Sequence, residues 1–285
     1  MTLGSVADHY DDLDVFYREV WGEHIHHGIW RTGRESVQIA IRQLIDYVAE
    51  KAEVYPGAHV VDIGAGYGGT ARVLANERRV RVTALTVSPA QLSYARAITG
   101  DTANPRVLLR DWLKNGLPDD CADVALAIES TEHMPDKALA FSEIRRVLRP
   151  GGRAVICAWI AGEARPWHVR HLLEPICREG RLAGLGTEED YQTLIERAGL
   201  ESVYVEDLTD FVKRTWRCGS GRVVAKLLLE RRYRAYALDP QSRHRVFLVT
   251  ILRVWAAYAL GAMRYLVFVA DRPARKASFA RRRRG

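Results

Sequence analysis

The amino-acid sequence predicts an α/β fold with a mostly parallel, seven-stranded sheet covered by helices on both faces. The first observation is an alternation of short apolar runs, rich in β-branched residues, with segments of helical periodicity. The second is a glycine-rich turn at residues 64–69, which directly follows one apolar run and opens a helical segment. The third is the placement of prolines and glycines between segments. Strands that alternate with helices are joined by crossovers, so most strands should run parallel.

The N-terminal region precedes the first predicted strand. Residues 1–33 are rich in aromatic residues and histidine, and residues 36–52 form an amphipathic helical pattern with Ile41, Leu44 and Val48 on one side. We expect a lid followed by a helix.

The strands and helices of the core follow in order. The helix after the second strand is expected to begin at Ser88, with Pro89 in its first position, and a later helix at Thr187, with acidic residues in its first turn. A helix over residues 136–148 should end before Pro150-Gly151-Gly152. The predicted strands cover residues 58–63, 80–86, 106–110, 122–128, 153–159, 200–205 and 264–270.

Two segments break the alternation, residues 161–186 and 207–261. Insertions after the carboxyl ends of strands lie beside the ligand crevice, so we expect both segments to roof a substrate pocket. Phe211 and Trp216 are candidate apolar pocket walls, although ordinary helix-to-sheet packing would also explain them. The expected organisation is an N-terminal lid and helix (1–55), a core (56–206), a helical cap (207–262), a last core strand (263–271) and a basic tail (272–285).

Composition excludes several classes of protein. The most apolar region, residues 246–270, is interrupted by Arg253 and Arg264, whereas a membrane span needs about 20 mostly apolar residues. We expect no secretory signal, because the first residues are not an apolar run and soon become acidic. The four cysteines are widely spaced and show no zinc pattern, so we expect no metal site and a reduced, cytoplasmic chain.

The net charge of +7 is unevenly distributed, and the chain ends in four arginines before Gly285. The simplest interpretation is a solvated tail; attraction to an anionic membrane surface or a diphosphate substrate is the alternative. We expect no nucleic-acid binding, because no nucleic-acid-binding module precedes the tail. The sequence leaves peripheral membrane contact and homo-oligomerisation open.

The glycine turn is the first candidate binding site. Gly64 and Gly66 let a ligand approach the backbone where a Cβ atom would clash, although a tight strand–helix turn alone would also explain them. Asp62 would repel a phosphate but suits a cation such as the ammonium of an amino acid, which favours S-adenosylmethionine (SAM) over a dinucleotide. The end of the second strand lacks the carboxylate that usually binds a dinucleotide ribose, so Thr86 and Gln91 would hydrogen-bond the ribose instead.

Several longer motifs carry a family resemblance. The chain resembles class I SAM-dependent methyltransferases of the tocopherol C-methyltransferase group and, more distantly, the cyclopropane and mycolic-acid synthases. The resemblance is strong over residues 7–160 and implies a Rossmann-like core. The motifs are D-H-Y-D at residues 8–11, W-G-E-H-I-H-H-G-I-W at 21–30, L-T-V-S-P-A-Q at 85–91, E-S-T-E-H-M-P-D-K at 129–137 and L-R-P-G-G at 148–152.

The resemblance also implies individual roles in cofactor binding. Asp62 and the turn after it would hold the amino-acid part of SAM, residues 86–91 the ribose, and Asp111 with Trp112 the adenine, although Asp111 would also suit a helix cap. The implied cofactor-binding residues are Tyr10, Asp62, Gly64, Ala65, Gly66, Thr86, Val87, Gln91, Asp111, Trp112, Ile128, Glu129 and His133.

Three histidines are candidate bases: His26, His27 and His133, with Glu132 as a partner. Each histidine would equally suit a role in orienting the lid or the cofactor, and His24 is expected in packing or at the surface. The cyclopropane and mycolic-acid synthases have a cysteine shortly after the tyrosine that matches Tyr10. Its absence here disfavours cyclopropanation.

We therefore expect a SAM-dependent methyltransferase that acts, with carbon as the accepting atom, on a hydrophobic small molecule (prenylated, aromatic or another specialised metabolite), and the sequence leaves open whether that molecule is also anionic. N- or O-methylation of a natural product, modification of a lipid at a membrane surface, and a non-catalytic SAM-binding protein are the alternatives. The arginine-rich cap would be either a solvated face or a site for an anionic or lipid-associated substrate.

Overall fold

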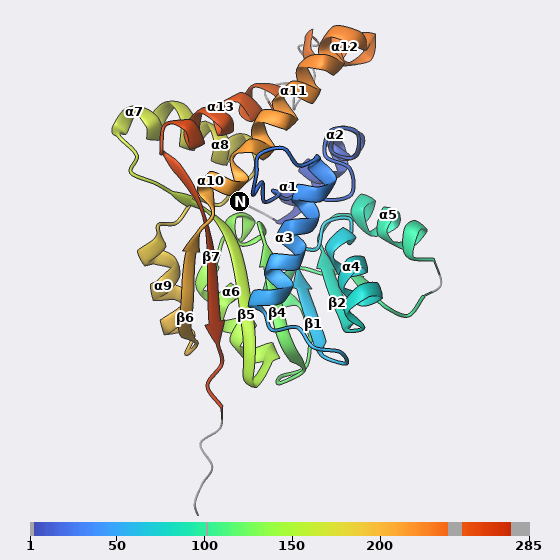
Figure 1. Ribbon diagram of the computed structural model, residues 1–285, viewed down its shortest axis with the longest axis vertical. Coiled ribbons are helices and arrows are strands. Elements are labelled where there is room, and N and C mark those ends of the chain that lie inside the picture. Colours follow the sequence, from blue (N-terminus) through green and yellow to red (C-terminus); the bar gives the residue numbers. More distant parts are fainter. Residues whose placement is uncertain (1–2, 101, 239–246, 275–285) are drawn as a thin grey trace, which may run out of the picture.

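A computed structural model describes residues 3–100, 102–238 and 247–274. The seven strands form one sheet in the order β3-β2-β1-β4-β5-β7-β6, which confirms the predicted α/β fold (Figure 1). Strands β1 to β5 run parallel, whereas β7 pairs antiparallel with both β5 and β6. The strands are β1 (His59–Ile63), β2 (Arg81–Thr86), β3 (Arg106–Leu109), β4 (Ala122–Ile128), β5 (Leu148–Ala161), β6 (Glu201–Asp207) and β7 (Met263–Asp271).

The structure shows the helix starts that the sequence predicts. Helix α3 (Val37–Lys51) begins after Ser36, whose side chain accepts a hydrogen bond from the backbone N–H of residue 39. Ser88 caps α5 (Pro89–Thr99) in the same way. Helix α9 (Glu188–Arg197) begins with a capping box, in which Thr187 and the third helical residue exchange hydrogen bonds.

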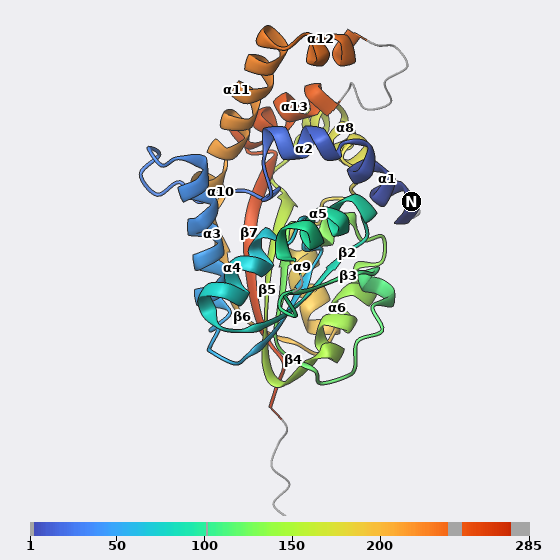
Figure 2. The same ribbon diagram turned by 90° about the vertical axis from the view of Figure 1, so that its right-hand side faces the viewer.

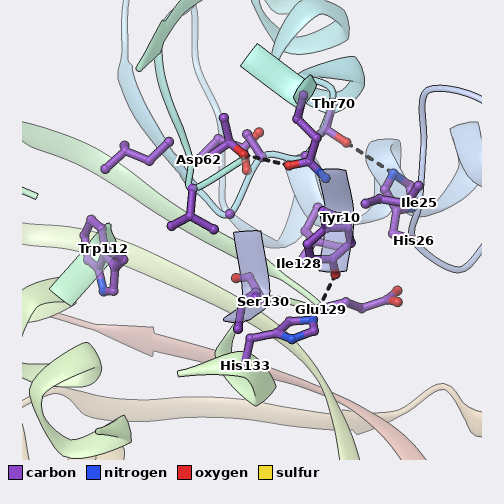
Figure 3. Close-up of a pocket in the computed structure, with 18 of the residues that line it drawn as sticks. Tyr10, Ile25, His26, Asp62, Thr70, Trp112, Ile128, Glu129, Ser130 and His133 are labelled. Carbon is purple, nitrogen blue, oxygen red and sulfur yellow. Dashed lines mark hydrogen bonds between the residues drawn. The ribbon is translucent and has the colours of Figure 1, made fainter. Parts of the chain in front are cut away.

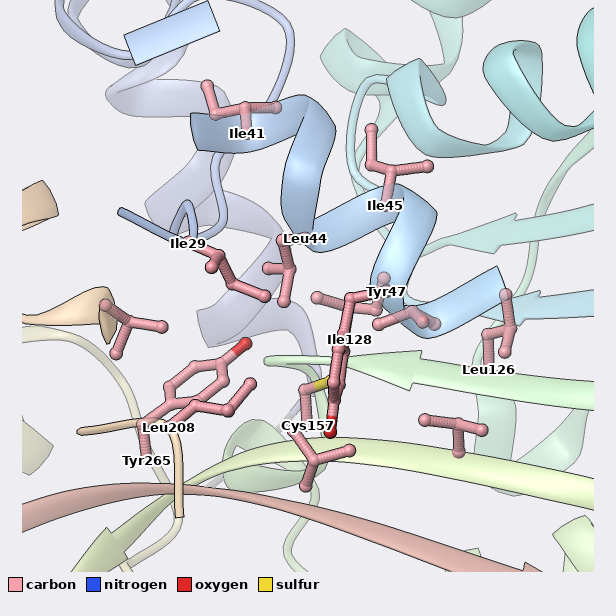
Figure 4. Close-up of a cluster of buried hydrophobic side chains, with 14 of the residues drawn as sticks. Ile29, Ile41, Leu44, Ile45, Tyr47, Leu126, Ile128, Cys157, Leu208 and Tyr265 are labelled. Atoms are coloured by element: carbon pink, nitrogen blue, oxygen red, sulfur yellow. The ribbon is translucent and has the colours of Figure 1, made fainter. Parts of the chain in front are cut away.

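Consecutive strand residues face opposite layers. Val60 belongs to a cluster with α3 and α4 (Gly69–Arg78), whereas Val61 belongs to a cluster with α6 (Lys137–Val147) and α9. Figure 2 shows these two helical layers on either side of the sheet. Figure 4 shows the contribution of α3 to the first cluster, where Leu44 and Tyr47 lie on the side of the helix that faces Ile128 of β4 and Cys157 of β5. The β-branched strands are therefore covered on both faces, as their composition predicts.

The remaining helices gather at the carboxyl ends of the parallel strands (Figures 1 and 2). Helices α1 and α2 come from the N-terminus, the segment from α7 to α8 follows β5, and α10 to α13 follow β6. None of the described helices is long and apolar enough to cross a membrane. The bounds are α1 (Leu3–Asp12), α2 (Asp14–Val20), α7 (Pro166–His168), a π-helical turn (Val169–Leu173), α8 (Glu174–Glu179), α10 (Thr209–Val212), α11 (Arg214–Leu229), α12 (Arg231–Leu238) and α13 (Phe247–Ala259).

Strand β5 differs from the expectation. It starts at Leu148 rather than at residue 153, because Leu148 already pairs with Ala122 before the register shifts around the Pro-Gly-Gly turn. The loop therefore ends α6, as predicted, but lies within the strand ladder. Residues 239–246 of the expected cap and 275–285 of the expected tail lie outside the described residues.

Candidate active site

A large cavity lies at the carboxyl ends of β1, β2 and β4, beneath α1 and residues 23–26 (Figure 3). Its empty volume, open mouth included, is about 990 Å³, near the upper end of the range of small-molecule sites. All thirteen residues expected to bind the cofactor line this cavity. It is called the cofactor cavity below.

The glycine turn is shaped by packing as well as by ligand access. Gly64 and Gly66 have φ values of +74° and +55°, which favour glycine. A Cβ atom on Gly64 would lie 2.4 Å from the Cβ of Ser130, so the loop after β4 occupies the space that this glycine leaves. Both functional and structural interpretations of the turn therefore apply to Gly64.

Asp62 is a buried carboxylate without a cation. Its Oδ2 atom has no hydrogen-bond partner among the described residues, and burial raises its pKa to about 7. The Ser130 hydroxyl, on the same cavity wall, is also buried and unpartnered within the described chain. A ligand with an ammonium group would satisfy Asp62, which is the fit expected of the amino-acid part of SAM.

The residues expected at the ribose and adenine are held by the protein itself. The Thr86 hydroxyl donates to Gln91 Oε1 at 2.6 Å, which fixes the orientation of the amide. Asp111 caps the short helix that follows it, accepting from the Leu113 N–H at 2.9 Å, and also lines the cavity, so both interpretations of Asp111 hold. The indole N–H of Trp112 donates to the Ala140 carbonyl at 3.0 Å, which fixes the ring at the cavity wall.

A second cavity opens beside the first, between α1–α2, α8, α11 and α13. It is called the acceptor cavity below. Its walls include Tyr17, Trp21, Trp159 and Trp216, and none of its lining residues is lysine or arginine. Five residues line both cavities, so the two meet there: Tyr10, Ile25, His26, Glu129 and His133.

Tyr10 and His133 form a hydrogen-bonded pair at this junction, 2.9 Å apart (Figure 3). His133 Nδ1 lies 3.1 Å from the Arg181 carbonyl, which can only accept, so Nδ1 carries the proton and Nε2 accepts from the tyrosine. Burial lowers the pKa of His133 to about 4, and burial with the charges of Glu132 and Glu129 raises that of Tyr10. His133 is therefore neutral at pH 7, with its lone pair at the junction.

Glu129 is the centre of a buried network. One carboxylate oxygen accepts from the His27 backbone N–H at 2.7 Å and the Tyr265 hydroxyl at 3.0 Å. The other accepts from the Trp159 indole at 3.0 Å and lies 2.9 Å from His27 Nδ1. Although burial opposes ionisation, His27 and the nearby His26 lower the pKa of Glu129. Its φ of +54° shows that the fold holds it in a strained conformation.

His27 has both ring nitrogens engaged. The Trp216 indole donates to Nε2 at 2.6 Å, so Nε2 is unprotonated and Nδ1 donates its proton to Glu129. The network thus joins the N-terminal segment, the sheet and α11. This geometry supports the orienting interpretation of His27 rather than that of a base.

The half-buried His26 and the buried Glu132 also line the acceptor cavity. His26 Nδ1 donates to the His27 carbonyl at 2.7 Å, Nε2 faces the Thr70 hydroxyl at 3.2 Å, and burial lowers the His26 pKa to about 4. Glu132 accepts from the Trp159 backbone N–H at 2.6 Å, and burial raises its pKa to about 7. Among the described residues, no group of three or more His, Cys, Asp or Glu side chains could hold a metal ion.

Two expectations need correction. Phe211 is not a pocket wall: the short helix α10 leaves its side chain exposed, while its backbone carbonyl accepts from the Trp30 N–H. His24 packs on Gly69, as expected, but also lines the cofactor cavity beside Glu23. Ile25, Thr70 and Ser130 also line the site without having been predicted. The motif at residues 21–30 and the loop at 129–137 were the signals for Ile25 and Ser130.

Comparison with known proteins agrees with this geometry. A family model described as a methyltransferase domain matches residues 61–156. The 27-O-demethylrifamycin SV methyltransferase of Amycolatopsis mediterranei is 32% identical over 75% of this chain and 80% of its own length. The chloroplastic tocopherol O-methyltransferase of Arabidopsis thaliana is 29% identical over 74% of this chain. The cyclopropane synthase MmaA2 of Mycobacterium tuberculosis shares the fold, with a TM-score of 0.83 at 20% identity, over 95% of this chain and 98% of that one.

The matched lengths differ among the relatives. The chain covers 67% of the Arabidopsis protein and 64% of the probable tocopherol O-methyltransferase of Oryza sativa subsp. japonica, about two thirds of each.

Proposed function

The chain belongs to the SAM-dependent methyltransferases, and from that premise we propose that it methylates a carbon atom of a hydrophobic small molecule bound in the acceptor cavity. SAM is the cofactor, and when bound it supplies an electrophilic methyl group on a sulfonium. In the N-terminal unit, residues 1–55, the part before α3 acts as the lid over both cavities while α3 covers the sheet, and residues 207–262 act as the cap that selects the acceptor.

The cofactor cavity supports specific binding roles. Asp62, buried and unpartnered within the described chain, would hold the ammonium group, and the glycine turn would receive the carboxyl end of the amino acid. Gln91, oriented by Thr86, would bind the ribose, and Asp111 the adenine amino group. Tyr10, Ile128 and His133 would enclose the sulfonium, which directs the methyl group toward the acceptor cavity.

The observation that carries the proposal is the aromatic acceptor cavity that meets the cofactor cavity at Tyr10 and His133. An alkene or electron-rich ring that gains a methyl group becomes cationic, and faces of Trp and Tyr rings stabilise a cation. The ionised Glu129 at the junction adds a favourable field, and no lysine or arginine lines the cavity to oppose it. His133, neutral and with Nδ1 held by the Arg181 carbonyl, would remove the proton from the methylated carbon through Nε2 once the Tyr10 hydroxyl turns away from that nitrogen.

The test is a screen with methyl-labelled SAM against prenylated phenols, terpenoids and matched amines, followed by NMR assignment of the labelled position. We expect a new C–CH₃ bond, and turnover at least ~100-fold lower in His133→Ala, because a positioned base contributes about 10²–10⁴-fold. A label found on oxygen, or equal turnover in the variant, would contradict carbon methylation with His133 as the base.

N-methylation is the second candidate, and one observation favours it. Two carboxylates, Glu129 and Glu132, lie against aromatic walls in the acceptor cavity, and such a site suits an amine that becomes more cationic on methylation. The two candidates differ in the labelled atom. Amine products with unchanged turnover in Glu132→Gln would remove the electrostatic argument for this candidate.

A further inference from the structure

Helix α13 is apolar on both of its faces. Its inner face is buried, and Thr250 and Val254 on that face line the acceptor cavity. Its single charged residue, Arg253, is paired with Glu179 at 2.6 Å. The outer face of a surface helix normally carries polar side chains. Here the outer face carries Val249, Leu252 and Trp255, and Leu260 directly follows the helix; each of these four side chains is between 46% and 51% exposed.

The apolar surface extends beyond this helix. The π-helical turn Val169–Leu173 packs against α13, and α7 lies next to it at the same end of the molecule (Figure 1). Trp167 of α7 is also more than half exposed. The five residues Val249, Leu252, Trp255, Leu260 and Trp167 form what is called the cap stripe below. An exposed apolar group of this kind marks an interaction surface.

Charge identifies the kind of partner. Residues 207–262 contain eleven lysine and arginine residues against four aspartate and glutamate residues, a net charge of +7 that equals that of the whole chain. Arg217, Arg231 and Arg234 of this region are exposed. Two copies of the chain that met through this region would bring two segments of net charge +7 together, which disfavours a self-association interface. An anionic surface satisfies both the apolar and the positive components.

We propose that the cap stripe docks on a bilayer that contains anionic lipids, with Trp255 and its apolar neighbours in the interface and the cap arginines at the headgroups. The contact is peripheral, as in interfacial amphipathic helices, because no described helix could span a membrane. Since the inner face of α13 lines the acceptor cavity, docking places a membrane-dissolved acceptor one helix away from its site. The inference does not depend on which atom is methylated, and its test requires no turnover.

The test is sedimentation of the full chain with vesicles of phosphatidylcholine alone or with 25% phosphatidylglycerol. We expect binding to the anionic vesicles, at least ~10-fold weaker binding to neutral ones, and weakening in 0.5 M NaCl because salt screens the arginines. The double variant Leu252→Glu/Trp255→Glu should lose at least ~10-fold in affinity. Ile98→Glu is the matched control, because Ile98 is 54% exposed on α5, outside the cap. Equal melting temperature and SAM affinity would show that the double variant folds.

A second readout locates the contact. Lipids brominated near the interface should quench the wild-type fluorescence more than that of Trp255→Phe. Equal vesicle binding by the double variant and wild type would overturn the proposal. So would loss of binding on deletion of residues 281–285 with no effect of the double variant, because the tail would then be the membrane contact. A dimer that the double variant dissociates, without vesicle binding by wild type, would assign the cap stripe to a second copy and also overturn it.

Discussion

The substitution Glu129→Gln tests the buried network most directly, because it changes one atom of a carboxylate that accepts from four donors. An amide nitrogen placed toward Trp159 and His27 Nδ1 would face two N–H groups. Placed toward Tyr265 and the His27 backbone it would face only one, since the tyrosine hydroxyl can turn to accept. The second orientation is cheaper, so the variant should adopt it.

The expected loss of folding stability follows from the number of N–H groups left unsatisfied. One buried N–H is left unsatisfied, at about 1–3 kcal/mol, and the remaining bonds lose their charge-assisted strength, so we expect a loss of about 2–4 kcal/mol. A loss of 1 kcal/mol lowers the melting temperature of a chain near this size by about 2–4 °C, which predicts a fall of roughly 5–15 °C.

The assay is thermal unfolding followed by circular dichroism, with Glu163→Gln, at an exposed residue, as the matched control. The double variant Glu129→Gln/Trp216→Phe should lose less than the sum of the single losses, because both side chains act on His27. A melting temperature within about 2 °C of wild type, or strict additivity, would refute the network as a coupled unit.

Four further predictions concern the cofactor cavity, the junction and the acceptor cavity. Asp62→Asn should weaken SAM binding at least ~10-fold by calorimetry, because the ammonium loses its charged partner. Without SAM, burial raises the pKa of the Asp62 carboxyl from 3.8 to about 7, so between these pH values the folded state holds a proton that the unfolded state has lost. As the pH rises from 4 to 7, wild type should therefore lose up to about 4 kcal/mol of stability relative to Asp62→Asn. Parallel pH dependences of the two proteins would contradict this. Because burial lowers the pKa of His133 to about 4, kcat at saturating SAM should not fall near pH 6.5 on acidification but closer to pH 4. A limb of kcat at pH 6.5 that survives in His133→Ala would exclude His133 as the titrating base. Trp216→Phe should raise the KM for the acceptor more than it lowers kcat, because it removes a cavity wall and the donor to His27; an unchanged KM would mean that the indole does not contact the acceptor.

Much of the fold followed from local sequence. Caps such as Ser88 and Thr187 are chosen by side chains that bond their own helix starts, so they can be read without tertiary structure. The buried strands were equally legible from their β-branched runs. The direction of β7 could not be predicted from the sequence, since side chains alternate in the same way along parallel and antiparallel strands.

The site likewise has parts that local sequence predicts and parts that only the folded chain brings together. Contiguous motifs located the cofactor cavity, because its walls come from loops that directly follow strands. The partners of His27 could not be predicted: Glu129 and Trp216 lie 102 and 189 residues away, and only the folded chain brings them together. The prediction of Phe211 as a pocket wall was wrong because a four-residue helix has too little periodicity to indicate which side an aromatic residue faces.

The pairing of β6 with β7 has a consequence for how such enzymes diversify. Asp207, the last residue of β6, pairs with Leu266, near the start of β7, so the cap leaves and re-enters the sheet at neighbouring positions. A segment anchored in this way can be lengthened, shortened or exchanged while the ladder below it stays closed. The four residues of this segment that line the acceptor cavity, Thr215, Trp216, Thr250 and Val254, can then change without altering the cofactor cavity, and a chimaera joined within this pairing would exchange that part of the acceptor wall alone.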